Sequence, residues 1–151
     1  MIHIEERIII NRPIEDVFAY VSDFRTASQW QSGVVDVQLT PEGSVGVGTR
    51  ATFVRVFLGR RLEMTVEIVE YEPPTKQVFK TISGPMMPGT VSRRFEPAAE
   101  GTTLSQVIEG QTGGVFALAE PLVAQSLSRG VKAAFGDLKD LLESRTVEVL
   151  S

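Results

Sequence analysis

The sequence contains no cysteine and only one histidine, His3. The absence of cysteine excludes disulfides, thiolate nucleophiles and zinc sites with cysteine ligands. A single imidazole excludes a metal site built from several histidines, and the acidic residues are scattered over faces expected to be wet. We expect His3 to be an exposed residue at a strand edge rather than a general base. The sequence offers no reason to expect a metal or a cofactor.

The sequence also lacks long hydrophobic runs and an excess of basic residues. No run approaches 18 apolar residues, and the N-terminus lacks the charged-then-apolar layout of a signal peptide. We therefore expect a cytoplasmic protein without membrane insertion. The formal net charge of -4 provides no basic field for holding phosphate backbones, so nucleic acid is not an expected partner. A monomer or a homodimer is compatible with these features.

The composition is that of an ordinary globular protein. Of the 151 residues, 42% are hydrophobic and 23% are charged, which is enough apolar material for one real core. We expect a single domain spanning residues 1–151.

The longest periodic segment runs from Val115 to Glu143, close to the C-terminus, and predicts one amphipathic helix. Its apolar residues recur at steps of three and four, as on one face of a helix. That face, which includes Phe116, Val123 and Leu127, must be buried against a partner. The opposite face is expected to stay in water and carries Gln125, Ser128, Arg129, Lys132, Lys139, Asp140 and Glu143.

The preceding residues predict a sheet. Ile4–Asn11 is rich in β-branched residues, and a short helical segment is expected after Pro13. Extended runs separated by Gly or Pro then follow, with loops too short for anything but antiparallel neighbours. They are Val34–Thr40, Thr49–Leu58, Leu62–Tyr71, Gln77–Ser83, Gly89–Glu96 and Thr102–Gly110.

Together these segments predict an α+β fold. About seven antiparallel strands form a curved sheet around the long C-terminal helix, with a short helical segment after the first strand. Apolar side chains do not all interdigitate across such a curved gap. We therefore expect an internal apolar cavity that is open at one end.

Five short motifs resemble a known superfamily along nearly the whole chain. They are Arg12-Pro13-Ile14-Glu15-Asp16-Val17-Phe18, Asp23-Phe24 with Trp30, Val47-Gly48-Thr49-Arg50, Glu70-Tyr71-Glu72-Pro73-Pro74, and Phe95-Glu96-Pro97 with Gly101-Thr102. This order and spacing is similar to the START/Bet v 1-like (SRPBCC) superfamily, and most of all to its polyketide cyclase/dehydrase-like bacterial group. The resemblance implies a helix-grip fold that holds sterols, lipids, hormones or polyketides, with a minority of enzymes.

Three polar residues interrupt apolar strand patterns. Arg55 shares a strand face with Phe53, Arg93 shares one with Phe95, and Gln106 lies between two apolar residues. If these faces are concave, two guanidinium groups project into the cavity and need a carboxylate or a ligand oxygen. If the strand register is reversed, for example by a β-bulge, both arginines are solvated. The sequence leaves both alternatives open.

Large apolar residues complete the candidate ligand contacts, although most of them also suit an ordinary core. Trp30 stands among polar residues, which predicts either a ring on the surface or one at the rim of a concavity. Met86 and Met87 lie between two prolines, and we expect a pliable lid there. The remaining candidates are Phe53, Phe57, Met64, Phe79, Phe95, Phe116, Val123 and Leu127.

Three functions remain open at this point. The first is a binding module that encloses a small hydrophobic molecule such as a lipid, a polyketide or an aromatic compound. The second, which the resemblance suggests, is a cyclase or dehydratase that acts on a bound poly-ketone and stabilises an enolate. The third is a protein-interaction domain.

Overall fold

The computed structural model describes residues 2–40, 43, 45–57, 59–84, 89–111 and 120–150. The side chains of residues 57 and 145–150 are outside this description, as are Met86, Met87 and Phe116 with the first residues of the expected long helix.

The elements follow the predicted order of strand, helix, six strands and long helix. They are β1 (Ile2–Ile10), α1 (Ile14–Ser22), the 3-10 helix η1 (Phe24–Thr26), α2 (Ala27–Trp30), β2 (Val34–Thr40), β3 (Arg50–Phe57), β4 (Arg60–Glu72), β5 (Lys76–Ser83), β6 (Gly89–Ala98), β7 (Gly101–Gly110) and α3 (Glu120–Leu150).

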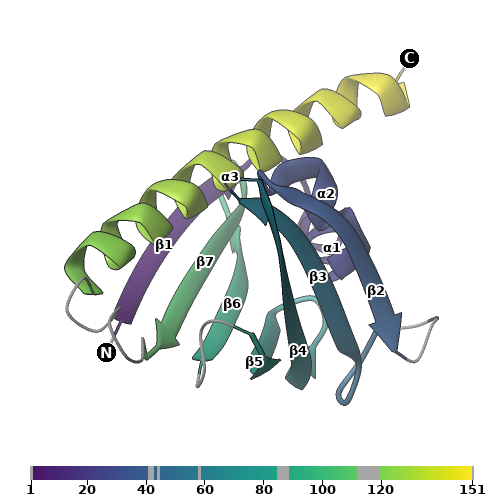
Figure 1. Ribbon diagram of the computed structural model, residues 1–151. Coiled ribbons are helices and arrows are strands. Elements are labelled where there is room, and N and C mark those ends of the chain that lie inside the picture. Colours follow the sequence, from purple (N-terminus) through teal and green to yellow (C-terminus); the bar gives the residue numbers. More distant parts are fainter. Residues whose placement is uncertain are drawn as a thin grey trace.

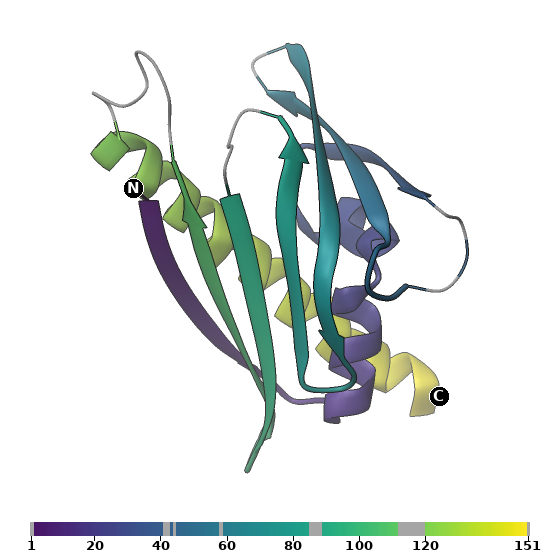
Figure 2. The ribbon, with the colours of Figure 1, turned by 90° about the horizontal axis from the view of Figure 1, so that it is seen from below.

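All seven strands form one antiparallel sheet in the order β1-β7-β6-β5-β4-β3-β2. Five consecutive hairpins build β2 to β7, and β1 joins the far side by pairing with β7. The sheet curves, α3 runs across its open side along β1, and α1 and α2 close one end (Figures 1 and 2). The predicted α+β fold is thereby confirmed.

Most strand ends differ from the predictions by one or two residues, and two larger differences concern helices. The helix α3 continues past Glu143 to Leu150, because the residues after Glu143 include neither glycine nor proline to stop it. The polar stretch after α1, for which no helix was expected, forms η1 and α2. There the side chain of Asp23 accepts a hydrogen bond from the backbone of Arg25 and so caps η1.

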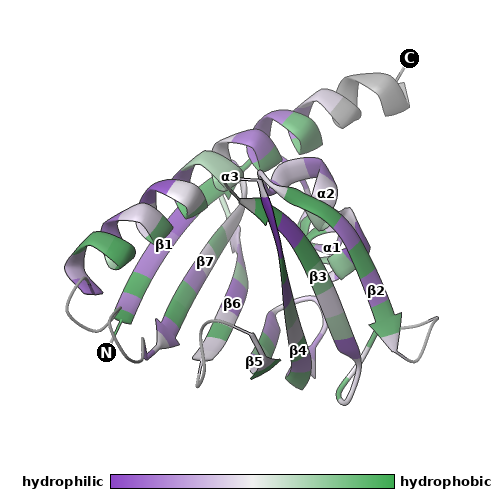
Figure 3. Cartoon of the chain, viewed as in Figure 1, coloured by the Kyte–Doolittle hydropathy of each residue, from purple (hydrophilic) through white to green (hydrophobic). Residues whose placement is uncertain are grey.

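The buried side chains form two separate core clusters. The first core cluster packs the C-terminal half of α3 and α1 against β1, β6 and β7, and includes Phe18, Trp30, Phe95 and Leu138. The second core cluster packs η1 and α2 against β2 to β5, and includes Phe24, Phe53, Ile68 and Phe79. Hydrophobic and hydrophilic residues alternate along the strands that supply these clusters (Figure 3).

One face of α3 differs from its prediction. Ser128, Lys139 and Glu143 were expected in water, but each contacts β1 or the loop after it. Ser128 Oγ donates to Glu6 Oε1 at 2.8 Å, and Lys139 Nζ donates to a backbone carbonyl of β1 at 2.7 Å. Glu143 Oε2 accepts a backbone N–H of the loop at 2.9 Å. The periodicity located the apolar face, but polar side chains at its border reach across to the sheet edge.

Candidate functional site

A row of four polar side chains crosses the inward face of the sheet. In register, Gln77 of β5 lies opposite Arg93 of β6, Arg93 lies opposite Gln106 of β7, and Gln106 lies opposite Glu6 of β1. Directly opposed residues point to the same face of a sheet. We call these four residues the polar row. The row faces inward, because Phe95, two residues after Arg93 on the same face, is buried in the first core cluster.

Arg93 is the centre of the polar row. Its side chain is only 5% exposed. Arg93 Nε donates to Gln106 Oε1 at 2.7 Å, and Nη1 donates to Gln77 Oε1 and to the carbonyl of Val21, both at 3.3 Å. All three acceptors are neutral. The inward-facing alternative left open by the sequence is therefore the one that the structure adopts for Arg93.

Two aromatic rings flank the guanidinium of Arg93. Its central carbon lies 5.6 Å from the ring centroid of Trp30 and 5.1 Å from that of Phe79. Both distances lie within the range of a cation–π contact. Trp30 belongs to the first core cluster and Phe79 to the second, so Arg93 lies where the two clusters meet.

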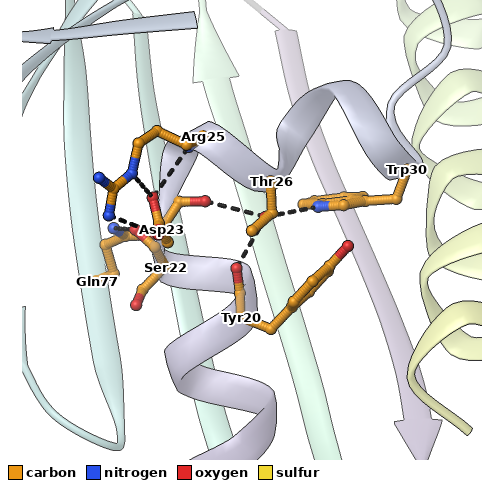
Figure 4. A network of polar contacts seen from close by, with 7 residues as sticks. All are labelled: Tyr20, Ser22, Asp23, Arg25, Thr26, Trp30 and Gln77. Carbon is orange, nitrogen blue, oxygen red and sulfur yellow. Dashed lines mark hydrogen bonds and ion pairs between the residues drawn. The ribbon is translucent and has the colours of Figure 1, made fainter. Parts of the chain in front are cut away.

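The corner between α1 and α2 holds these contacts in place (Figure 4). Thr26 Oγ1 contacts the carbonyl oxygens of Tyr20 and Asp23 at 2.8 and 2.9 Å, and it accepts a hydrogen bond from Trp30 Nε1 at 3.3 Å. On the sheet side, Gln77 Nε2 donates to the carbonyl of Ser22 at 2.9 Å. These bonds fix the Trp30 ring and one side of the polar row.

Burial lowers the pKa of Arg93 to about 10, because desolvation penalises the charged form. The guanidinium still carries its proton at neutral pH. Among the described residues, no carboxylate forms an ion pair with Arg93. Glu6, the acidic member of the polar row, interacts instead with Ser128 and, at 3.9 Å, with Lys132. The positive charge of Arg93 therefore has no counter-charge in the described part of the chain.

Two donors of the polar row are still free within the described part of the chain. Gln106 must present its Oε1 to Arg93, because a guanidinium only donates, so its Nε2 is left as a donor. Neither Gln106 Nε2 nor Arg93 Nη2 forms a hydrogen bond with a described residue. No buried polar side-chain atom of the described residues lacks a partner. The described residues therefore do not completely enclose either free donor.

Burial along the inward face changes from one end of the sheet to the other. At the end covered by α1, Ile10, Phe95 and Leu104 are at most 1% exposed. On the other side of the polar row, Val91 and Ile108 are only half-buried, and Leu62 is 40% exposed. Ile2, Ile4 and Phe79 on that same side are buried, so solvent contact there is confined to positions such as Val91, Ile108 and Leu62.

The structure places the other predicted site residues in three groups. Trp30, Phe53, Phe79 and Phe95 are buried in the core clusters, so Trp30 does not lie at an exposed rim as its polar neighbours had suggested. Its ring is covered because η1 and α2 fold it onto the sheet. The half-buried group consists of Met64 on β4 and Val123 and Leu127 on α3. The side chain of Phe57, and Met86, Met87 and Phe116 entirely, lie outside the described residues.

Arg55 is on the inward face but outside the polar row. It lies opposite Leu62 of β4 and on the same strand face as Phe53. The side chain is exposed near the end of β3, and its Nη2 donates to Gln31 Oε1 at 2.8 Å. Arg55 therefore lies beside the exposed Leu62 and not beside the buried donors Arg93 and Gln106.

Sequence reasoning missed Gln77 and Glu6. Gln77 is fully buried, yet it stood at the boundary of a predicted strand. Gln77 lies two residues before Phe79, so both side chains point to the same face of the strand. This spacing could have predicted that Gln77 faces inward. Glu6 lies at steps of two from four isoleucines on the same face of β1 and could have been found in the same way.

No group of three or more His, Cys, Asp or Glu side chains suited to a metal occurs within the described ranges. His3 lies between Glu5 and Glu109 but is exposed on the outward face of β1, as expected for a strand-edge residue. The described helices also include none that is long and apolar enough to cross a membrane.

The fold and the interior define a class of protein: a small α+β domain whose curved sheet and long helix enclose an apolar interior with one buried guanidinium. The chain belongs to the family described as polyketide cyclase / dehydrase and lipid transport, whose model matches residues 1–143. This assignment confirms the predicted resemblance. At the level of the family, it supports hydrophobic ligand binding or polyketide cyclisation. No curated protein matches the sequence.

Solved structures share the fold at low sequence identity. The protein TTHA0849 from Thermus thermophilus has a TM-score of 0.77 and 19% identity, with 95% of this chain and 97% of that chain covered. The di-domain ARO/CYC StfQ from the steffimycin biosynthetic pathway has a TM-score of 0.79 and 16% identity, with 96% of this chain but 52% of that chain covered. Ara h 8.0201 has a TM-score of 0.74 and 17% identity, with 94% and 97% covered.

Proposed function

We propose that this domain binds a small, mainly hydrophobic molecule on the inward face of the sheet, between the polar row and the half-buried residues beyond it. The observation that carries the proposal is the pair of free donors, Arg93 Nη2 and Gln106 Nε2, in otherwise apolar surroundings. Few, well-placed polar groups in an apolar enclosure are typical of ligand sites. Apolar burial supplies affinity at about 25 cal/mol per Å², and the two donors orient the ligand.

The half-buried residues of the inward face supply the apolar contacts in this proposal. They include Met64, Val91 and Ile108 from the sheet, and Val123 and Leu127 from α3. A ligand that covers them removes apolar surface from water without displacing any fully buried side chain. Contacts of Met86, Met87 and Phe116 with the ligand remain predictions. The lid formed by the two methionines also remains a prediction.

Mass spectrometry of the freshly purified protein tests the proposal. We expect a discrete extra mass under native conditions that disappears on denaturation, followed by identification of the released compound after solvent extraction. Arg93→Met should weaken retention of that compound at least tenfold, since the ligand oxygen loses a charged donor. Arg94→Met is the matched control, because Arg94 is exposed on the opposite face of the same strand. A protein that is empty and takes up no hydrophobic probe would contradict the proposal.

A second candidate function is a cyclase or dehydratase. The observation in its favour is the same guanidinium, because a preorganised donor in an apolar site stabilises an enolate oxygen. This function predicts that the protein converts a poly-ketone, and that Arg93→Met abolishes the conversion while the variant still folds. Retention of the compound without conversion would favour the binding module.

A further inference from the structure

Resting on the proposed binding function, we infer that the natural ligand carries an anionic oxygen, such as a carboxylate or an enolate, and that Arg93 and Gln106 bind this oxygen. A neutral lipid or hydrocarbon would fit the apolar surroundings but would leave the central feature of the interior unexplained.

The first argument is the charge of Arg93. The side chain is only 5% exposed, and its hydrogen bonds go only to two amide oxygens and one backbone carbonyl. A buried charge is costly unless it is paired. The flanking rings of Trp30 and Phe79 offset part of this cost, but cation–π contacts do not neutralise the charge. An anionic ligand supplies the missing counter-charge.

The second argument is the arrangement of the free donors. Arg93 and Gln106 are directly opposed on β6 and β7, and the bond between Arg93 Nε and Gln106 Oε1 fixes the orientation of both groups. The donors left over are Nη2 of one residue and Nε2 of the other. Both of these groups are donors, while Gln106 Oε1 already accepts the bond from Arg93 Nε and keeps one further lone pair. The pair therefore suits a ligand oxygen that accepts two hydrogen bonds. Ketone and carboxylate oxygens both do so, and the charge of Arg93 favours the carboxylate, whose hydrogen bond to a guanidinium is charge-assisted.

The third argument is the position of Glu6. This carboxylate is in the polar row, but it is two strands away from Arg93 and contacts Ser128 and Lys132 on α3. Its charge is thus compensated near the helix. The chain places an acid in the row without pairing it to the guanidinium, and the central position stays open to an external anion.

Two matched pairs of compounds test this inference. Decanoate is compared with 1-decanol, and 2-naphthoate with 2-naphthalenemethanol, all below their aggregation limits, by calorimetry and by the fluorescence of Trp30. Trp30 is the only tryptophan of the chain and lies against Arg93, so its emission reports on this site. We expect the acid of at least one pair to bind about ten times or more tighter than its alcohol, as a charge-assisted hydrogen bond to a desolvated cation implies.

Gln106→Glu is the decisive variant, because it places a carboxylate beside Arg93 without changing the size of the side chain. The internal pair should satisfy the guanidinium, so the preference for the acid should disappear while the alcohol still binds. Ser105→Glu is its control: it adds the same charge on the outward face of β7, opposite Arg94, and should leave the preference unchanged. Should Gln106→Glu fail to fold, Arg93→Met is measured in its place and carries the same expectation.

The possible outcomes separate the two proposals. If alcohols bind as tightly as acids, or if Gln106→Glu keeps the preference for the acid, the inference of an anionic ligand is wrong and the binding function stands. If neither member of either pair binds, the proposed binding function is itself overturned, and this inference with it.

Discussion

Arg93 and Gln106 face each other directly across β6 and β7, and the 2.7 Å bond from Arg93 Nε to Gln106 Oε1 is the shortest hydrogen bond of the buried guanidinium. This pair lies where the two core clusters meet, between Trp30 and Phe79. An apolar pair at the same place would join the clusters into one continuous core. The polar pair keeps a charge inside the domain, at a cost in stability that a purely structural role does not require.

The first prediction concerns Gln77, which links the sheet to α1. Gln77→Leu removes the bond to the carbonyl of Ser22 and one of the three acceptors of Arg93, so two buried hydrogen bonds are lost. We expect the free energy of unfolding to fall by about 2–4 kcal/mol, measured by urea denaturation. Gln38→Leu, at a position on β2 away from the row, should change it by less than about 0.5 kcal/mol. Equal effects of the two substitutions would show that the buried amide does not support the row.

The second prediction concerns Gly101, where β7 begins against the end of β1. Its φ is +134°, and an added Cβ would lie 2.2 Å from the carbonyl oxygen of Ile10. Gly101→Ala should lower the free energy of unfolding by roughly 2–4 kcal/mol, because both the backbone and the contact must shift. Gly130→Ala, at an exposed position of α3 with open space, should instead stabilise by about 0.5–1 kcal/mol. Thermal unfolding of both variants is the measurement: the melting temperature should fall for Gly101→Ala and rise for Gly130→Ala.

The third prediction concerns the packing of α3. Leu138 is fully buried in the first core cluster, whereas Leu122 on the same helix is 69% exposed. Leu138→Ala should lower the free energy of unfolding by about 2–5 kcal/mol through lost burial and a cavity, and Leu122→Ala by less than about 0.5 kcal/mol. Chemical denaturation of both variants is the measurement. Similar losses at the two positions would contradict the helix orientation.

The fourth prediction concerns pH and His3. Hydrogen bonds to Glu5, at 3.0 Å, and to Glu109, at 3.3 Å, raise the pKa of His3 above its ordinary value of 6.5. A raised pKa means that the folded state favours the protonated imidazole. The resulting stabilisation is fully present below pH about 6.5 and is lost as the pH rises through the raised pKa of the folded state.

Because His3 is the only histidine, a proton NMR titration of its ring reads this pKa directly. The midpoint should lie above 6.5, and His3→Gln should remove the corresponding decline in melting temperature. A midpoint at or below the ordinary value would show that the two carboxylates do not bind the imidazole in solution.

Much of the fold followed from local patterns. The six extended runs with short turns predicted the antiparallel sheet, and the steps of three and four predicted the long helix that covers it. Both patterns are reliable because side chains at a regular spacing along a strand or a helix lie on the same face, which is the buried one. The end of α3 at Leu150 was missed, since helix ends depend on weak local preferences.

The residue pattern alone was enough to establish that a curved sheet and one long amphipathic helix must cover each other, because the apolar faces of both need burial. The candidate site, in contrast, depends on the tertiary structure. Gln77, Arg93 and Gln106 come from three different strands, and only the pairing of β5 with β6 and of β6 with β7 aligns them in one row. A shift of one residue in either pairing would turn a side chain to the other face, and no local pattern determines that register. Whether the charge of Arg93 meets water or a buried ring depended on where α1 and α2 bring Trp30, and that contact joins segments far apart in the chain.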